Sequence, residues 1–464
     1  MQAHYFYEYQ LLWLAIGCFI ALIADHRASS RRRRETVKDS KDERAEGGIS
    51  SAGTAGSLAS LTRQYLTVYA IVMGADWLQG PYVYSLYSEQ YQLAPNMVAI
   101  LFVTGFISAG LAAPLVGVWA DQHGRKRLCM IFCASYTCAC LCILVPILPV
   151  LLFGRVLGGI STSILFSAFE SWLISSANSH AIPQNDLSLI MGRATLVNGL
   201  IATAAGVFSN QLVGISGSFA SPFIASGALL IVAWFVIRAM WTENFGGASD
   251  KASADPFQLG RLSIALRIVS EDTRLLVLGV TQTCFEGSMY LFVFLWVPSL
   301  QEFSTLTLLP LGYIFSAFML SMMLGSLFYT LLSTSSSEGT LITHAKLSSS
   351  VCALAGLSLA LSVSQQDERT RFWAFCLFEA CVGMYYPVQG MLRGTLIANE
   401  QRATLSALFR VPLNIFVVVS LLTGVASAGA RTTVLSACSV MLAAASILTG
   451  VFIVGKVDQT AARA

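Results

Sequence analysis

Long apolar runs follow one another along almost the whole chain, and short polar segments separate them. Many of these runs exceed the roughly 18 residues that an α-helix needs to cross a bilayer. They are continuous rather than built from alternating ten-residue segments, which disfavours a transmembrane β-barrel. The pattern predicts thirteen transmembrane helices, near residues 8–25, 65–87, 97–119, 128–148, 150–174, 189–212, 219–239, 274–297, 308–333, 343–364, 372–393, 405–428 and 432–455.

The first apolar run is followed at once by a strongly basic block. The run lacks the positively charged start of a signal peptide, and basic residues stay on the cytoplasmic side of a membrane. We therefore predict a retained anchor helix over 1–25 with its N-terminus outside. The block, rich in Ser, Gly and mixed charge, predicts a disordered cytoplasmic linker over 26–62. Its alternatives are a nuclear localisation signal or a patch that contacts anionic lipid.

The remaining lysines and arginines test this orientation. With the N-terminus outside, the loops that carry most of them all fall on the inner side, whereas the outer loops carry only Arg369, Arg371 and Arg431. This asymmetry indicates twelve core helices after the anchor. A polar cytoplasmic linker over 241–273 divides them into two six-helix halves, 63–240 and 274–455, with a cytoplasmic tail over 456–464. Two joined six-helix halves are typical of a transporter with repeated halves.

Composition supports a membrane protein and excludes several other classes. The chain of 464 residues is 55% hydrophobic and 11% charged, against about 25% charged in soluble domains. A net charge of +3 is too small to indicate a nucleic-acid partner. The eleven cysteines lie within apolar runs without the spacing of a zinc site, so no metal and no cofactor is expected. The chain also lacks HExxH, GxSxG and P-loop motifs, which argues against an enzyme.

The segment GVWADQHGRKR (117–127) lies between the second and third core helices. It resembles the signature loop of the major facilitator superfamily, although Gln122 stands where that family often has Arg. We expect Gly117 to let helices approach closely and Asp121 to cap a helix or pair across the two halves. Gly124, Arg125 and Lys126 complete the motif, whose basic residues anchor the loop at the inner surface. The corresponding loop of the second half, 333–346, is not recognisable.

A closer resemblance covers nearly the whole chain. The segments ADWLQGPY (75–82), GRVLGG (154–159), FSAFESW (166–172), FVFLW (292–296) and FRVPL (409–413) are similar to the eukaryotic molybdate-anion transporter family of that superfamily. The extra N-terminal helix fits as well. The resemblance implies an all-α bundle of six plus six helices, and uptake of molybdate at a cell membrane.

Ionisable residues inside a membrane are costly, so each one is a candidate for function. Six lie within the core spans in three pairs that occupy corresponding helices of the two halves: Asp76 with Glu286, Arg155 with Glu379, and Arg193 with Arg410. In the resembling superfamily the first, fourth, seventh and tenth core helices line the central cavity, which implies that the first two pairs face it. The alternative is structural: Asp76 and Glu286 would then pair with buried arginines.

Under the transport interpretation each residue has a distinct role. An arginine suits an oxyanion because its planar guanidinium donates two hydrogen bonds and keeps its charge. Arg155 is the candidate ligand, or else it tunes a neighbouring carboxylate, in which case Arg193 or Arg410 would bind the anion. The acids carry protons. Tyr290 and Tyr385 are candidate donors to the anion.

The candidates nearer the membrane surfaces are given gating or anchoring roles. Arg193 and Arg410 either snorkel to the inner surface or contact Asp121, and for Arg410 this gate role is preferred. Glu170 is expected to pair with Arg125 as a latch. Tyr87, at a helix end, reads as an interfacial anchor.

The leading hypothesis is therefore an alternating-access transporter of molybdate that acts as a monomer. Its partners are the anion, possible coupling protons and membrane lipid, with no nucleic acid. The alternatives are a transporter of another solute, such as a sulfate-like anion, a sugar or an organic cation, and a non-transporting receptor with the same fold. Two mid-membrane acids facing a cavity favour a cation, so neutralising them separates these cases.

Overall fold

The structure is a computed structural model. It describes residues 2–41, 51–245, 266–304, 306, 308–335, 340–397, 402–424 and 427–455. Most of the predicted linker 241–273 and the tail 456–464 lie outside the described residues.

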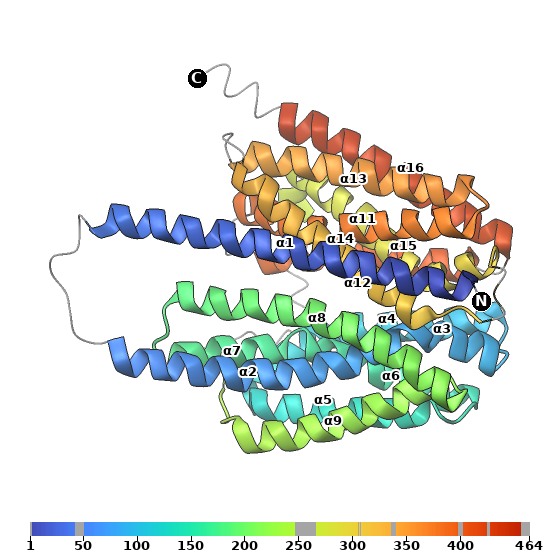
Figure 1. Cartoon of the computed structure of the whole chain (residues 1–464), viewed down its shortest axis with the longest axis horizontal. Coiled ribbons are helices and arrows are strands. Elements are labelled where there is room, and N and C mark those ends of the chain that lie inside the picture. Colours follow the sequence, from blue (N-terminus) through green and yellow to red (C-terminus); the bar gives the residue numbers. More distant parts are fainter. Residues whose placement is uncertain are drawn as a thin grey trace. The chain divides into compact units, whose positions relative to one another are not determined.

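The described part of the chain is helical throughout, and it contains no strand (Figure 1). The helices are α1 (Gln2–Lys41), α2 (Ser51–Gln79), α3 (Val83–Ser85), α4 (Pro95–His123), α5 (Arg125–Cys142), α6 (Leu148–Leu165), α7 (Ala168–Ser179), α8 (Gln184–Ser216), α9 (Ser221–Met240), α11 (Thr273–Gln301), α12 (Leu311–Ser335), α13 (Thr340–Ser364), α14 (Glu368–Leu396), α15 (Arg402–Thr423) and α16 (Ala428–Thr449). Each of the thirteen predicted spans is mainly helical; the span 65–87 runs from α2 into α3 and the turns beside it, and the span 150–174 is divided between α6 and α7. The all-α class is confirmed.

Nine helices in the described ranges are long and apolar enough to cross a membrane by length and composition. The four remaining predicted spans lie on α2, α5, α14 and α15. Two of these have a visible reason: α5 begins with three basic residues, and the apolar part of α15 is only Leu408–Thr423.

The basic block differs from its prediction. Helix α1 continues through the block to Lys41, and α2 begins at Ser51, so 26–41 and 51–62 are helical where disorder was expected. The physical reason is that Arg, Lys and Glu are good helix formers. A block of mixed charge therefore extends a helix that the apolar run has already nucleated.

The chain divides into two compact units. The N-terminal unit comprises residues 22–92 and 104–256, and the C-terminal unit comprises 1–21, 93–103 and 257–464. The start of α4, predicted in the N-terminal half, belongs to the C-terminal unit, and so does the start of α1, which was predicted as a separate anchor.

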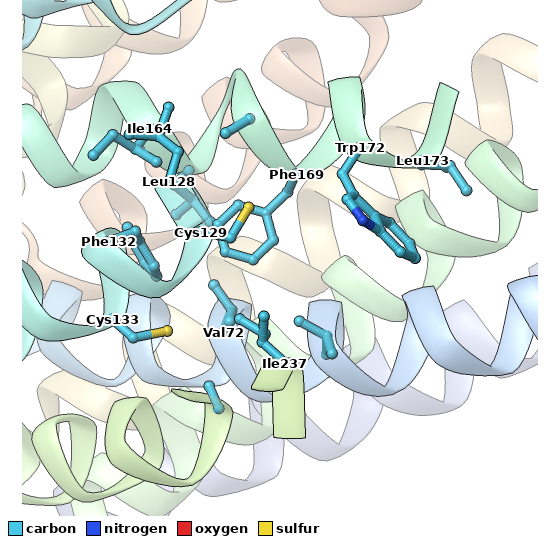
Figure 2. Packing of buried hydrophobic residues seen from close by; sticks show 14 of the residues in the cluster. Val72, Leu128, Cys129, Phe132, Cys133, Ile164, Phe169, Trp172, Leu173 and Ile237 are labelled. Carbon is cyan, nitrogen blue, oxygen red and sulfur yellow. The ribbon is translucent and has the colours of Figure 1, made fainter. Parts of the chain in front are cut away.

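The N-terminal unit is built around one apolar core. Helix α2 packs against α8 and α9, while α5 packs against α6 and α9. In Figure 2, Val72 of α2, Phe132 of α5, Phe169 of α7 and Ile237 of α9 are directed toward the same core. Each of these side chains is at most 1% exposed, so one core fixes four helices.

In the C-terminal unit, α13 packs against α14 and α16, and α12 packs against α14. The α12–α14 contact depends on two glycines. A Cβ added at Gly325 would lie 1.9 Å from the carbonyl oxygen of Ala380, and one added at Gly383 would lie 1.9 Å from that of Met322. Glycine at both positions therefore allows the two backbones to touch, as small residues do in membrane helix pairs.

The start of α1 packs on the start of α14 within the C-terminal unit. Tyr7 is 1% exposed, and its hydroxyl donates a hydrogen bond to Oε1 of Glu368. The Tyr7 and Phe372 rings meet edge to face at 5.2 Å between centroids, and the Arg369 guanidinium lies 4.9 Å from the centroid of Phe6. Asp367 caps α14, and the hydrogen bonds from Thr370 lower its pKa.

We expect Tyr7→Phe to destabilise the protein by about 1–2 kcal/mol, because it removes a hydrogen bond to a carboxylate and leaves the packing unchanged. Thermal unfolding of the purified chain measures this. Tyr9→Phe is the matched control on the same helix, since Tyr9 is 60% exposed. Equal unfolding temperatures for the two variants would show that the Tyr7 contact contributes nothing.

Candidate functional site

The first core helix loses its regular α-helical form at Gly80 and Pro81. After α2 come a 3₁₀ turn (η1, Gly80–Tyr82), the short α3, and a π-helical turn (η2, Leu86–Gln90). Proline cannot donate an amide hydrogen bond and its ring crowds the preceding turn, which accounts for the break. The irregular segment carries Tyr87, which is fully buried. Tyr87 is therefore not an interfacial anchor, and that prediction is corrected.

Arg155 lies half-buried on α6, against the backbone of α4. A Cβ added at Gly105 would lie 2.7 Å from Nη2 of Arg155, so only glycine leaves room for the guanidinium. The helices themselves also meet closely, since a Cβ at Gly159 would lie 2.4 Å from the carbonyl oxygen of Gly105. Two glycines thus position a positive charge inside the N-terminal unit.

The Arg155 side chain lines a small cavity of about 20 Å³. Its other polar lining residues are Gln79, Tyr87 and Tyr136, and its remaining lining is Ala139, Ile143, Leu151, Gly154 and Gly158. The volume is enough for about one water molecule. Among the described residues that line it, the polar groups are a guanidinium, two phenols and an amide, and no carboxylate. The Tyr136 hydroxyl donates to Asp76 and the Gln79 amide to Oγ of Ser226, so the feature of this lining that suits an anion is the positive charge of Arg155. We call it the Arg155 cavity.

Asp76 lies beside this cavity but does not line it. The Tyr136 hydroxyl donates a hydrogen bond of 2.7 Å to Oδ1 of Asp76. The structural alternative foresaw a buried arginine as the partner of Asp76, and the partner is a tyrosine instead. Asp76 and Arg155 thus belong to one neighbourhood in which Tyr136 lies next to both.

In the C-terminal unit, Glu286 forms a buried ion pair. Nη2 of Arg393 lies 2.9 Å from Oε1 of Glu286, which is 9% exposed. The Tyr385 hydroxyl donates to the same oxygen at 3.4 Å, and Nε2 of Gln282 donates to Oε2 at 3.3 Å. The Tyr385 ring stacks on Phe285 with 3.9 Å between centroids. The structural alternative expected an arginine as the partner of Glu286, and Arg393 lies at that place; whether the pair serves structure or transport stays a prediction.

The other C-terminal candidates stay apart from this pair. Glu379 is 6% exposed and makes neither a hydrogen bond nor an ion pair with any residue that the structure describes. Arg410 is exposed on α15 and makes no hydrogen bond or ion pair within the described ranges. Tyr290 is half-buried on α11, one helical turn after Glu286.

Two candidates of the N-terminal unit are not brought into a site. Arg193 is exposed on α8 and has no polar partner in the described part of the chain. Glu170 is exposed near the start of α7 and does not pair with Arg125, so the predicted latch is corrected. The reason is local: Nη2 of Arg125 is held 2.8 Å from Oδ1 of Asp121, one helical turn away in sequence.

The signature loop is held by a residue outside the motif. Glu243, just after α9, accepts hydrogen bonds from the backbone amides of Lys126 at 2.8 Å and Arg127 at 3.2 Å, and so caps the start of α5. In return, Nζ of Lys126 donates to the carbonyl oxygen of Trp241 at 2.6 Å. The Glu243 carboxylate lies at the N-terminus of α5, which carries a partial positive charge, and the Lys126 ammonium lies at the C-terminus of α9, which carries a partial negative charge. Both contacts are electrostatically favourable.

Glycine is required at one of the two motif positions. Gly124 has φ +97°, and a Cβ there would lie 2.6 Å from Oε1 of Glu243. Gly117 has no heavy atom within 4 Å of an added Cβ. The expectation that Gly117 permits close helix approach is therefore corrected.

We expect Gly124→Ala to destabilise the protein by about 1–3 kcal/mol, through backbone strain and loss of the Glu243 cap. Gly117→Ala is the matched control and should leave stability unchanged or slightly raised, since alanine favours a helix. Thermal unfolding of both purified variants measures the change in stability. Equal losses of stability in Gly124→Ala and Gly117→Ala would contradict the requirement for glycine at position 124. Binding of substrate at a distant site should be retained in both variants.

Three contributing residues escaped sequence reasoning. Tyr136 lies in the predicted span 128–148 and Glu243 in the predicted linker 241–273, and neither segment has a feature that marks the residue as functional. Arg393 falls at the predicted end of its span, where arginine is common. Arg393 lies four residues after Gln389 and eight after Tyr385, so all three residues lie on one helix face. This spacing is the pattern from which the sequence could have indicated Arg393 as a site residue.

The fold is shared with solved transporters of known class. The nucleoside transporter NupG superposes with a TM-score of 0.67 at 11% identity, over 84% of this chain and 99% of that one. An autoinhibited peptide transporter of the POT family gives 0.67 at 12% identity, over 84% and 96%. At these identities the comparison shows the class of fold: the chain shares the multi-pass helical bundle of these two transporters.

Sequence comparison gives the family. A family model described as sugar transporters with twelve transmembrane segments matches residues 43–368. A molybdate-anion transporter of Takifugu rubripes is 32% identical over 442 residues, which cover 88% of this chain and 91% of that protein. The Xenopus tropicalis protein of the same name is 34% identical over 365 residues, or 77% of each chain. The chain belongs to the molybdate-anion transporter family of the major facilitator superfamily.

Proposed function

We propose that this protein carries molybdate into the cell by alternating access and that the Arg155 cavity provides the anion site. The observation that supports the proposal is that Arg155, with its permanent positive charge, lines one cavity together with Tyr87, Tyr136 and Gln79, and that no carboxylate is among the described lining residues. Relatives that share most of the chain bear the name molybdate-anion transporter.

The chemistry of the cavity favours an anion over the alternative solutes. A carboxylate would favour a cation, but Asp76, which accepts a hydrogen bond from Tyr136, is not among the lining residues. A sugar is neutral and gains little from a guanidinium, whereas a doubly charged tetrahedral oxyanion gains both charge and paired hydrogen bonds. A cavity sized for one water must widen to admit the anion, which fits a site that opens during the transport cycle.

Proton coupling, in this proposal, rests on Glu379 rather than on Glu286. Glu286 already has Arg393 as a partner, so its charge is balanced within the fold. Glu379 is buried without a partner among the described residues, so the free energy of charging it depends strongly on whether water reaches it. A carboxyl group of that kind takes up a proton in one state of a cycle and releases it in another.

The distribution of charge along the chain supports a particular orientation in the membrane. The excess of Lys and Arg in the inner loops supports an N-terminus outside and a C-terminus in the cytoplasm, with the protein in the cell membrane and in contact with lipid. All proposed ligands of the anion come from one unit of one chain, which supports a monomer as the working unit.

Uptake of isotopic molybdate into cells that lack a carrier of their own tests the proposal. We expect uptake that unlabelled molybdate abolishes and that a sugar in excess leaves unchanged; sulfate measures selectivity among oxyanions. Uptake that the sugar abolishes and molybdate does not would replace the proposal with the alternative solute.

A further inference from the structure

The basic block that follows the first membrane span has no task in the transport of molybdate. We propose that its four consecutive arginines, residues 31–34, form a binding site for the headgroups of anionic phospholipids at the membrane surface. This site is separate from the Arg155 cavity, and it does not depend on which solute the protein carries.

Helix α1 is longer than a membrane is thick. Its 40 residues, Gln2–Lys41, extend over about 60 Å at about 1.5 Å per residue, whereas a bilayer with its headgroups measures about 40–45 Å. The part of α1 with the length and hydropathy of a membrane span is Phe6–Arg27. Residues 28–41 therefore continue the helix beyond the apolar core of the membrane.

The four arginines lie at the level of the lipid headgroups. They are the fourth to seventh residues after Arg27, which places them about 6–10 Å past the end of the apolar span. This is the outer part of the headgroup layer and its immediate surface, within the Debye length of about 8–10 Å at physiological salt. A disordered block would spread the same charges over many heights, whereas the helix holds them at one.

The block is also suited to anions by its charge and by its helical geometry. Residues 26–41 include seven basic and two acidic residues, a surplus of five positive charges. Arginine offers paired, charge-assisted hydrogen bonds to a phosphate group. Successive residues of a helix are rotated by about 100°, so four in a row cover most of its circumference. At any rotation of α1, one of the four therefore lies on the side that adjoins lipid.

Helix α1 adjoins lipid rather than protein over most of its described length. Trp13 is 66% exposed and Phe19 is 65% exposed, although both belong to the apolar span. The described polar contact of α1 with the C-terminal unit lies in its first turns, where Tyr7 bonds to Glu368. At the other end Arg27 is exposed. The block thus begins on a helix whose nearest surroundings are lipid, and lipid headgroups are the anions within its reach.

The test is binding of fluorescent phosphatidylserine to the purified full-length protein in a neutral detergent, followed by the anisotropy of the lipid probe. Fluorescent phosphatidylcholine, which carries no net charge, is the control probe. We expect phosphatidylserine to bind about tenfold more tightly at physiological salt. The difference should vanish at about 1 M salt, where the Debye length falls to about 3 Å. This comparison needs only the wild-type protein.

Two pairs of substitutions on α1 separate the position of the charges from their number. Arg31→Gln/Arg32→Gln should weaken the binding of phosphatidylserine about tenfold or more, because each basic residue near an anionic surface contributes about fivefold. Lys38→Gln/Lys41→Gln is the matched control. It also removes two charges, but these lie about 16–21 Å past the span, so affinity should stay within about twofold of wild type. Glutamine favours a helix, so both variants keep α1.

Equal losses of affinity in the two variants would show that net charge alone attracts the lipid, and would overturn the inference. Equal affinity of the wild-type protein for the two lipids would also overturn it, and would leave the block to its other interpretation, a nuclear localisation signal. The transport proposal is judged separately. A protein that binds phosphatidylserine as expected but takes up no molybdate would support the lipid site and contradict the proposed function alone.

Discussion

Arg155→Ala is expected to weaken the binding of molybdate about 100-fold, which corresponds to about 3 kcal/mol. The reason is that a guanidinium offers two charge-assisted hydrogen bonds to one oxyanion, and each such bond contributes about 1.5–3 kcal/mol. Gly105 leaves space for the guanidinium, and Gly159 allows α6 to approach α4 closely. Equilibrium binding to the purified protein measures the loss.

Arg155→Lys tests whether the charge alone or the paired donors of the guanidinium bind the anion. Lysine keeps the charge but lacks the planar pair of donors, so we expect it to recover only part of the affinity. Arg193→Ala is the matched control, because Arg193 belongs to the same unit but is exposed on α8. Wild-type affinity in Arg155→Ala, together with a large loss in Arg193→Ala, would move the anion site to Arg193.

The second large effect is expected on stability. Arg393→Leu leaves the carboxylate of Glu286 buried without its ion-pair partner, and breaking a buried pair in this way costs about 3–5 kcal/mol. The bonds from Tyr385 and Gln282 remain, but both are long and neither carries charge. Thermal or denaturant unfolding of the purified variant measures the loss.

The double variant Glu286→Leu/Arg393→Leu provides the control. Replacing both charges by apolar residues removes the uncompensated charge, so most of the stability should return. Molybdate binding should then be preserved, because this account gives Glu286 a structural role. Restored stability combined with lost transport would show instead that Glu286 takes part in the cycle.

The fold was largely predictable from sequence because two strong signals decide it. Apolar runs of membrane-spanning length predicted every helix span, and the distribution of Lys and Arg divided them into an anchor and two halves. The helical basic block was missed because composition was read as disorder, although its residues individually favour a helix. The assignment of the start of α4 to the C-terminal unit is a matter of tertiary packing, which a single sequence does not encode locally.

The site was predictable only in part, for a physical reason. Hydropathy identifies which charges are buried, and so Asp76, Arg155, Glu286 and Glu379 were found. It does not reveal their partners, which depend on how each helix is rotated about its axis. Tyr136 and Arg393 are therefore visible only in three dimensions. The expected Glu170–Arg125 latch failed because Asp121, four residues from Arg125, is the nearer partner.

The most direct test of the central claim is the flux of isotopic molybdate into liposomes that contain only the purified protein. The account predicts uptake by counterflow when the liposomes are preloaded with unlabelled molybdate, and loss of that uptake in Arg155→Ala but not in Arg193→Ala. Counterflow that is absent from the wild-type protein, or equal in wild type and Arg155→Ala, would contradict it.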